Sequence, residues 1–242
     1  MAGSLSVFTT LDPRLEGAIR ELGLVEPTEI QRLAFPLLST DSDALLLSPT
    51  GTGKTEAALL PLLSHRLTLP TPPISILYVT PLRALNRDLE HRIVGLVKQV
   101  GLTAAVRHGD TPTAARLAQS RQPPDLLLTT PETLQLLLTG VRLRASLAHV
   151  RTVIIDEVHE LVGSDRGAQL SITLERLDRL TGRTVRRVGL SATVGNPGEV
   201  ARFLSPAPRD VEVRVAKERR PLELTARRPA GTCSTTSAPA TS

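Results

Sequence analysis

A glycine-rich segment follows a short apolar run near the start of the chain, where residues 45–55 spell LLLSPTGTGKT. Glycines in such a turn let backbone N–H groups point inward around phosphate oxygens, and the N-terminus of the following helix adds a partial positive charge. An ordinary glycine-rich turn is the alternative, which Gly-Lys-Thr between a strand and a helix disfavours. The residues expected to hold the nucleotide are Thr50, Gly51, Thr52, Gly53, Lys54 and Thr55.

Two adjacent acids, Asp156 and Glu157, follow the apolar run TVII. Lys54 is expected to contact the β- and γ-phosphates, and the Thr55 hydroxyl and Asp156 are the expected Mg²⁺ ligands. Glu157 can orient and deprotonate an attacking water, so Lys54 and Glu157 are the candidate catalytic residues. A charge pattern at a helix N-terminus is the alternative explanation of the two acids.

A glutamine, Gln31, ends the segment GLVEPTEIQ at residues 23–31. Its amide carries a donor and an acceptor side by side, which matches the N6 and N7 edge of adenine. Gln31 is therefore expected to select ATP over GTP, and the predicted cofactors are ATP and Mg²⁺.

Two Thr-Pro pairs, Thr80-Pro81 and Thr130-Pro131, each end an apolar run. Thr as N-cap and Pro at the first helical position predict two helix N-termini on one edge, which can hold successive phosphates of a nucleic-acid strand. Arg83 can add a charge-assisted contact. Simple helix capping is the alternative for both pairs.

Short apolar runs alternate with longer amphipathic stretches along the chain. Such alternation predicts an α/β fold, a doubly wound and mostly parallel sheet with helices on both faces, and the motifs above lie at the carboxyl ends of its strands. The predicted strands are 43–48, 74–80, 125–130, 152–157 and 187–193, and the clearest helical stretches are 85–100 and 167–180.

Composition sets wider bounds on the function. The net charge of +5 and the pI near 10.3 suit a polyanionic partner, but the arginines are scattered. With no tryptophan, a platform that stacks bases is not expected. The single cysteine, Cys233, excludes an internal disulfide. No apolar run suggests a membrane span and the start lacks a signal-peptide pattern, so a cytoplasmic protein without a membrane partner is predicted.

The ordered motifs resemble the superfamily 2 helicases, the group that includes the DEAD-box proteins, over about residues 5–225. The segment at 23–31 is similar to the adenine-recognising Q motif of that group, and Phe8 is a candidate for the upstream aromatic that packs on adenine. Further likenesses are SPTGTGKT to motif I, DEVH to motif II, PLRAL (81–85) to motif Ia, TPETL (130–134) to motif Ib and SAT (191–193) to motif III. The resemblance implies a RecA-like P-loop NTPase domain.

Three longer segments resemble the Lhr-type (large helicase-related) proteins: 107–111, 156–177 and 188–197. That resemblance implies an ATP-dependent DNA helicase that moves 3′ to 5′ and acts in DNA repair. RNA or an RNA–DNA hybrid is the alternative partner, because phosphate contacts alone do not detect the 2′-hydroxyl. His159, Ser191 and Thr193 are expected to couple the nucleotide site to the strand site.

The expected organisation is a Q-motif helical region at 1–43, part of the same domain as the RecA-like domain 1 at 44–216, and a linker remnant with a low-complexity tail at 217–242. Motifs of a second RecA-like domain are not found after residue 200, so the sequence predicts a chain that ends before helicase domain 2. A second RecA-like domain in another chain would then be needed for motor activity, and the isolated chain would hydrolyse ATP slowly. A nucleotide-gated nucleic-acid-binding module, or a fragment of an RNA helicase, is the alternative.

Overall fold

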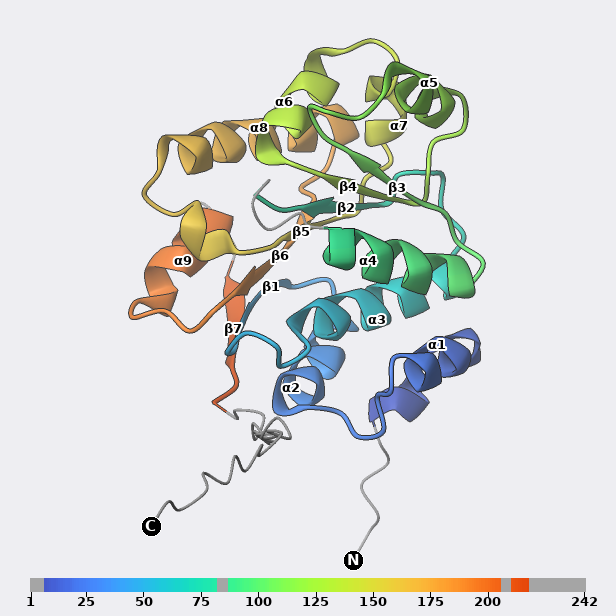
Figure 1. The fold of residues 1–242 in the computed structure, drawn as a ribbon. Coiled ribbons are helices and arrows are strands. Elements are labelled where there is room, and N and C mark those ends of the chain that lie inside the picture. The colour runs from blue at the N-terminus through green and yellow to red at the C-terminus, as the bar shows by residue number, and fades with distance from the viewer. Residues whose placement is uncertain (1–6, 82–86, 206–209, 218–242) are drawn as a thin grey trace, which may run out of the picture.

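The computed structural model describes residues 7–81, 87–205 and 210–217 of the chain. In these ranges a seven-stranded sheet forms the centre, in the order β3-β4-β2-β5-β6-β1-β7 (Figure 1), and every neighbouring pair is parallel. The strands are β1 Asp43–Leu47, β2 Ile76–Val79, β3 Ala104–Arg107, β4 Leu126–Thr129, β5 Thr152–Ile155, β6 Arg186–Ser191 and β7 Val211–Val215.

Helices cover both faces of this sheet, as the alternating pattern predicts. Helices α1 to α4 lie on one face, and α6 to α9 lie on the other. The helices are α1 Glu16–Glu21, α2 Glu29–Leu38, α3 Lys54–Thr68, α4 Arg87–Gln99, α5 Thr113–Arg121, α6 Pro131–Thr139, α7 Arg144–Leu147, α8 Asp165–Thr181 and α9 Pro197–Leu204.

Successive residues of the central strands enter two separate apolar cores. In β2, Tyr78 packs with the helices α1 to α4, whereas its neighbours Leu77 and Val79 pack with α6 to α9. Because side chains alternate across a strand, a strand covered on both faces must be apolar throughout. The predicted doubly wound parallel fold is therefore confirmed.

All five strands expected from the apolar runs are present, but the edge strands β3 and β7 were not predicted. Residues of β3 and most of β7 are half-buried, so neither forms a continuous apolar run. In β7 the sequence VEVRV alternates instead, which is typical of a strand with one solvated face. Among the described helices, none is long and apolar enough to cross a membrane.

Two consecutive arginines of β6 are buried and point to different layers. Arg186 donates to the carbonyl oxygens of Leu37, Leu38 and Ser42, where α2 ends. Arg187 forms ion pairs of 2.9 Å with Glu175 and 2.8 Å with Asp178, both on α8. A buried charge is tolerated only when it is paired or hydrogen-bonded, so these contacts tie β6 to the helices on both sides.

A glycine near the start of α8 allows this helix to approach the segment before it closely. A Cβ atom built on Gly167 would lie 2.0 Å from the carbonyl oxygen of Leu161, in the segment that follows Asp156-Glu157. Side chains do not tolerate such a distance to backbone, so a larger residue would push α8 away from this segment.

We expect Gly167→Ala to lower the free energy of unfolding by about 1–3 kcal/mol, because the methyl group forces a backbone shift. Gly95→Ala is the matched control in helix α4, where an added Cβ meets nothing within 4 Å. Since alanine favours helix more than glycine does, the control should stabilise the protein by roughly 0.5–1 kcal/mol. Urea denaturation measures both, and equal effects of the two substitutions would contradict the close approach.

Candidate nucleotide and nucleic-acid site

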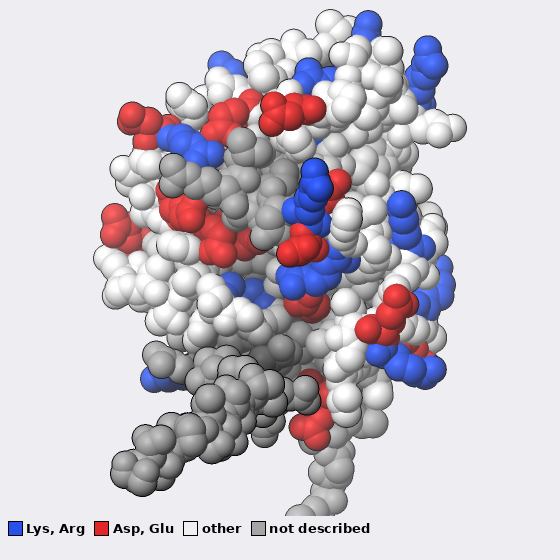
Figure 2. Space-filling model, viewed as in Figure 1, with Lys and Arg blue, Asp and Glu red and all other residues white. Residues whose placement is uncertain are grey.

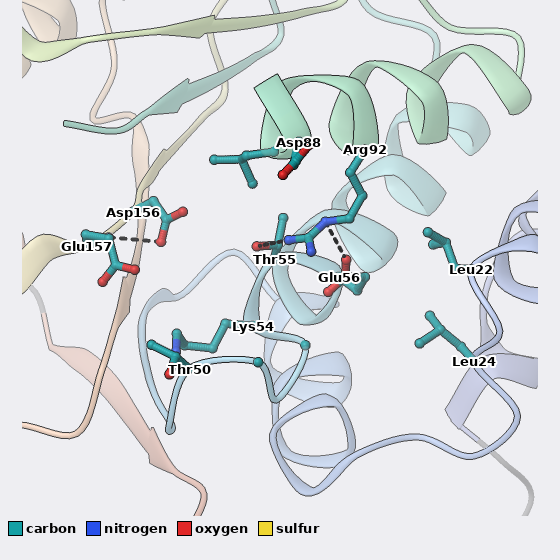
Figure 3. A pocket seen from close by; sticks show the side chains of 13 residues that line it. Leu22, Leu24, Thr50, Lys54, Thr55, Glu56, Asp88, Arg92, Asp156 and Glu157 are labelled. Carbon is teal, nitrogen blue, oxygen red and sulfur yellow. Dashed lines mark hydrogen bonds and ion pairs between the residues drawn. The ribbon is translucent and has the colours of Figure 1, made fainter. Parts of the chain in front are cut away.

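The phosphate loop and the Asp156-Glu157 pair line one cavity of about 490 Å³ at the carboxyl edge of the sheet (Figure 3). Its walls come from the loop after β1, the ends of α3 and α4, the end of β5 and the loop after α1. This size is ordinary for a small-molecule site, and this edge is where parallel α/β sheets bind ligands. The lining residues are Leu22, Leu24, Thr50, Gly51, Gly53, Lys54, Thr55, Glu56, Asp88, Leu89, Arg92, Asp156 and Glu157.

The phosphate loop adopts the turn that its glycines predict. Gly51 and Gly53 have φ angles of 77° and 86°, which L-amino acids with a side chain rarely adopt. Inside the loop the Thr52 hydroxyl donates to the carbonyl of Pro49 at 2.8 Å and pairs with the Ser48 hydroxyl at 2.6 Å. Thr52 is buried and therefore shapes the loop, whereas Thr50 and Gly51 face the cavity.

The ammonium group of Lys54 folds back onto this loop. Nζ donates to the carbonyl oxygens of Ser48 at 2.7 Å and Pro49 at 3.0 Å. Burial lowers the pKa of Lys54, while the charges of Glu157 and Asp156 act in the opposite direction. Within the described residues, the hydrogen-bond partners of Nζ are thus neutral carbonyl groups, beside the place where the loop would receive phosphates.

The two predicted carboxylates stand at the end of β5, facing Lys54 and Thr55 (Figure 3). Asp156 is 7% exposed, and burial raises its pKa even though the Tyr78 hydroxyl and the Glu157 N–H donate to it. Burial and the charge of Asp156 also raise the pKa of Glu157. Two adjacent carboxylates with raised pKa values are typical of functional sites, because burying two negative charges side by side lowers stability.

Backbone geometry singles out Glu157 as well. Its φ of 48° is one of two positive values among the described non-glycine residues, the other being at Ile74. A residue in this region costs of order 1–3 kcal/mol unless its surroundings hold it, and such residues concentrate at functional sites. The conformation turns the chain at the end of β5 and leaves the Glu157 side chain lining the cavity.

Two of the three predicted coupling residues are in contact. His159 Nδ1 lies 3.4 Å from Glu157 Oε2 and 3.1 Å from the hydroxyl of Ser191, at the end of β6. Thr193 is exposed and makes no hydrogen bond with the described residues. The segment with the acids and the segment of motif III are therefore joined through His159.

The residues present fit Mg²⁺. Hydroxyl and carboxylate oxygens are its preferred ligands, and Thr55 and Asp156 present one of each to the same cavity. Among the described residues no cluster of three or more His, Cys, Asp or Glu side chains could hold a metal. That donor set suits Mg²⁺, which proteins usually bind with one or two side chains together with phosphate oxygens and water.

Gln31 lies behind the phosphate loop and is not among the residues that line the cavity. Its side chain is fully buried: Oε1 accepts from the N–H of Thr28 at 3.0 Å, and Nε2 donates to the carbonyl of Gly53 at 3.5 Å. Recognition of adenine by Gln31 stays a prediction, while its position indicates a support for the phosphate loop. Phe8 packs edge-to-face on Phe35, with 5.8 Å between ring centroids.

The structure describes one of the two Thr-Pro pairs as a helix start. Thr130 caps α6, accepting from the N–H of Thr133, and Pro131 is the first residue of the helix. Pro81 is not within a helix, because the described part of α4 begins at Arg87. Arg83 lies outside the described residues, so its predicted phosphate contact has no structural description.

Sequence reasoning missed two polar residues that contact the expected Mg²⁺ ligands. Arg92 of α4 donates to the Thr55 hydroxyl at 3.3 Å and forms an ion pair of 3.2 Å with Glu56 (Figure 3). Tyr78 of β2 donates to Asp156 at 2.5 Å. Neither Arg92 nor Tyr78 belongs to a short motif, although the polar Tyr78 within the apolar run ISILYV was a signal.

The distribution of charged side chains on the surface does not by itself mark the site. On the face shown in Figure 2, described Lys and Arg side chains lie interspersed with Asp and Glu. This face therefore has no continuous basic patch, in agreement with the scattered arginines of the sequence.

A family model described as DEAD/DEAH box helicase matches residues 28–200. The Lhr helicase/probable uracil glycosylase of Mycolicibacterium smegmatis is 44% identical over 194 residues, covering 74% of this chain and 13% of that protein. The ATP-dependent helicase Lhr-Core of Methanothermobacter thermautotrophicus is 39% identical over 193 residues, covering 73% of this chain and 22% of that protein. This chain thus spans between about an eighth and a quarter of the length of these two curated relatives.

Solved structures give the same result. The structure of Mycobacterium smegmatis helicase Lhr bound to ssDNA and AMP-PNP matches with a TM-score of 0.75 and 38% identity, over 88% of this chain and 29% of that one. The DEAD-box helicase Mss116 bound to ssRNA and UDP-BeF matches with a TM-score of 0.73 at 20% identity, over 88% of this chain and 45% of that one, and shows the shared RecA-like fold alone. The chain belongs to the DEAD/DEAH box helicase family, and the two curated relatives described above are Lhr helicases.

Proposed function

We propose that this chain is the ATP-binding and strand-binding RecA-like domain of an Lhr-type DNA helicase. The observation that carries the proposal is a cavity lined by both the phosphate loop and the Asp156-Glu157 pair, whose charges act on Lys54. ATP is the proposed nucleotide, supported by the AMP-PNP in the Lhr structure of M. smegmatis.

Each residue of the cavity has a proposed task. Backbone N–H groups of the loop hold the phosphates, and Lys54 exchanges its carbonyl contacts for phosphate oxygens. Thr55 and Asp156 would hold Mg²⁺, which when bound neutralises phosphate charge during phosphoryl transfer. Glu157 orients the attacking water and accepts its proton, and its raised pKa makes it a stronger base than an exposed glutamate.

The proposed strand site lies on the same edge of the sheet, at the start of α6. The start of α6 at Thr130-Pro131 offers the partial positive charge of a helix N-terminus to a phosphate of the strand, and Pro81 and Arg83 are proposed to add further contacts. We propose DNA as the strand because the M. smegmatis Lhr structure contains ssDNA. Movement from 3′ to 5′ and a role in DNA repair are proposed from the Lhr resemblance.

Coupling of the two sites is proposed to pass through His159. It contacts the proposed base Glu157 and, through Ser191, the end of β6. A change in the charge or position of Glu157 during hydrolysis would therefore reach motif III, where Thr193 is exposed to a partner domain or strand.

We expect Lys54→Ala to weaken ATP binding roughly 10- to 100-fold, because hydrogen bonds to charged groups contribute about 1.5–3 kcal/mol. Fluorescence titration with a labelled ATP analogue in the presence of Mg²⁺ measures the effect. Lys98→Ala, at an exposed position of α4, is the control that removes the same charge outside the cavity. Equal affinities of the two variants would contradict the assigned role of Lys54.

We expect Glu157→Gln to retain ATP binding and to lower single-turnover hydrolysis by roughly 10²–10⁴-fold, because the amide cannot accept the proton of the water. Glu160→Gln is the control, since Glu160 is exposed and three residues away. Radiolabelled ATP, with DNA, RNA or no strand present, gives the rates. Unchanged hydrolysis in Glu157→Gln would remove Glu157 from the mechanism.

We expect the unmodified chain itself to hydrolyse ATP slowly and to unwind no duplex. An arginine finger contributes on the order of 10³–10⁵ to the rate of phosphoryl transfer, and we propose that a second RecA-like domain supplies it. Steady-state ATPase and strand-displacement assays test this expectation. Rapid strand-stimulated ATPase activity of the chain alone would contradict the need for that domain.

A further inference from the structure

A fully buried tyrosine connects the two residues expected to hold Mg²⁺. Tyr78 lies within β2 with 0% of its surface exposed, and its hydroxyl donates to Asp156 Oδ2 at 2.5 Å. Thr55 lies beside the same phenol and acts to lower its pKa, against the larger effects of burial and of the Asp156 charge, which raise it. The phenol thus stands next to one residue of the phosphate loop and one of the acidic pair.

Arg92 extends these contacts to a fourth residue. Its Nη2 donates to Thr55 Oγ1 at 3.3 Å, and its Nε is held by Glu56 at 3.2 Å (Figure 3). The hydrogen bonds of this group run from Arg92 to Thr55 and from Tyr78 to Asp156, and Thr55 stands beside Tyr78. We call this series the Arg92–Asp156 relay.

The described hydrogen bonds leave acceptor positions available on both expected Mg²⁺ ligands. A hydroxyl oxygen has two lone pairs and one proton. At Thr55 one lone pair accepts from Arg92, which leaves the other for a cation. At Asp156, Tyr78 occupies one position on Oδ2 and the Glu157 N–H one on Oδ1, so both oxygens keep acceptor capacity.

Burial makes this arrangement costly to disturb. Asp156 is 7% exposed, so its carboxylate depends on the Tyr78 hydroxyl and the Glu157 N–H for hydrogen bonds. Tyr78 is in a strand covered on both faces, so its ring cannot move without disturbing the core. The hydroxyl therefore holds Asp156 in one orientation relative to Thr55.

We propose that Tyr78 is a positioning residue which sets the distance and orientation between the two Mg²⁺ ligands before any nucleotide binds. The inference rests on the proposed ATP-binding function. It adds a residue outside the short motifs, which acts through Thr55 and Asp156 and touches neither nucleotide nor metal. Outer partners of metal ligands typically change metal affinity about 10- to 100-fold when they are removed.

The test is Tyr78→Phe, which keeps the ring in the core and removes the hydroxyl alone. Equilibrium binding of AMP-PNP is measured in a Mg²⁺ titration and again in excess EDTA. We expect the Mg²⁺ concentration for half-maximal enhancement of binding to rise about 10-fold, with affinity in EDTA unchanged. A purely structural role of the hydroxyl would lower the unfolding midpoint without changing the Mg²⁺ requirement.

Ser75→Ala is the matched control, because Ser75 precedes the same strand and its buried hydroxyl has no hydrogen-bond partner among the described residues. Its Mg²⁺ requirement should equal that of the unmodified chain. Arg92→Gln tests the other end of the relay at a half-exposed position that does not threaten folding, and we expect a smaller rise of about 3-fold, within the range for partners of such ligands.

An unchanged Mg²⁺ requirement in folded Tyr78→Phe overturns the proposal. If Tyr78→Phe does not fold, an unchanged requirement in Arg92→Gln overturns it instead. Failure of the proposed function has a different signature, because the unmodified chain would then bind no AMP-PNP with or without Mg²⁺.

Discussion

The site is organised around a carboxylate that is buried at the end of an apolar strand. Burial disfavours the charge of Asp156, and the molecule compensates with a hydroxyl from β2, a backbone N–H from the next residue and a lysine across the cavity. Those partners come from the phosphate loop, from the adjacent strand and from the turn that places Glu157. Strand order, loop conformation and the turn at Glu157 therefore serve one requirement. Together they stabilise the buried negative charge of Asp156, which can then bind a cation.

The same requirement explains why the sheet is assembled in this order. β6 lies between β1, which carries the phosphate loop, and β5, which carries the acids. Ser191 at the end of β6 thus contacts His159, beside Glu157, without a long connecting loop. At the start of β6, the consecutive buried arginines Arg186 and Arg187 connect that strand to helices of both layers. A rigid central strand is well suited to pass a change from one site to another, because packed elements move as units.

Contacts in the site differ in how exchangeable they are. Lys54 rests on carbonyl groups and Arg92 is half exposed, so both can adopt new partners when a ligand enters. Tyr78 and Gln31 are fully buried and hold the loop and the acids from behind. The cavity therefore combines cations whose present partners a ligand could replace with buried polar groups that define its shape, as preorganised sites require.

From the sequence alone, the five buried strands, the phosphate loop and the place of Asp156-Glu157 could be predicted, because apolar runs and glycine spacing are local signals. The edge strands β3 and β7 were not predicted, because half-buried strands lack a continuous apolar run. The position of Gln31 behind the loop and the partners Tyr78 and Arg92 could not be predicted either. They depend on which strands and helices become neighbours, since residues 55, 78, 92 and 156 meet only after the chain has folded. Sequence determined the chemistry that is available, and tertiary structure decided which groups support it, because burial and distance are properties of the packed chain.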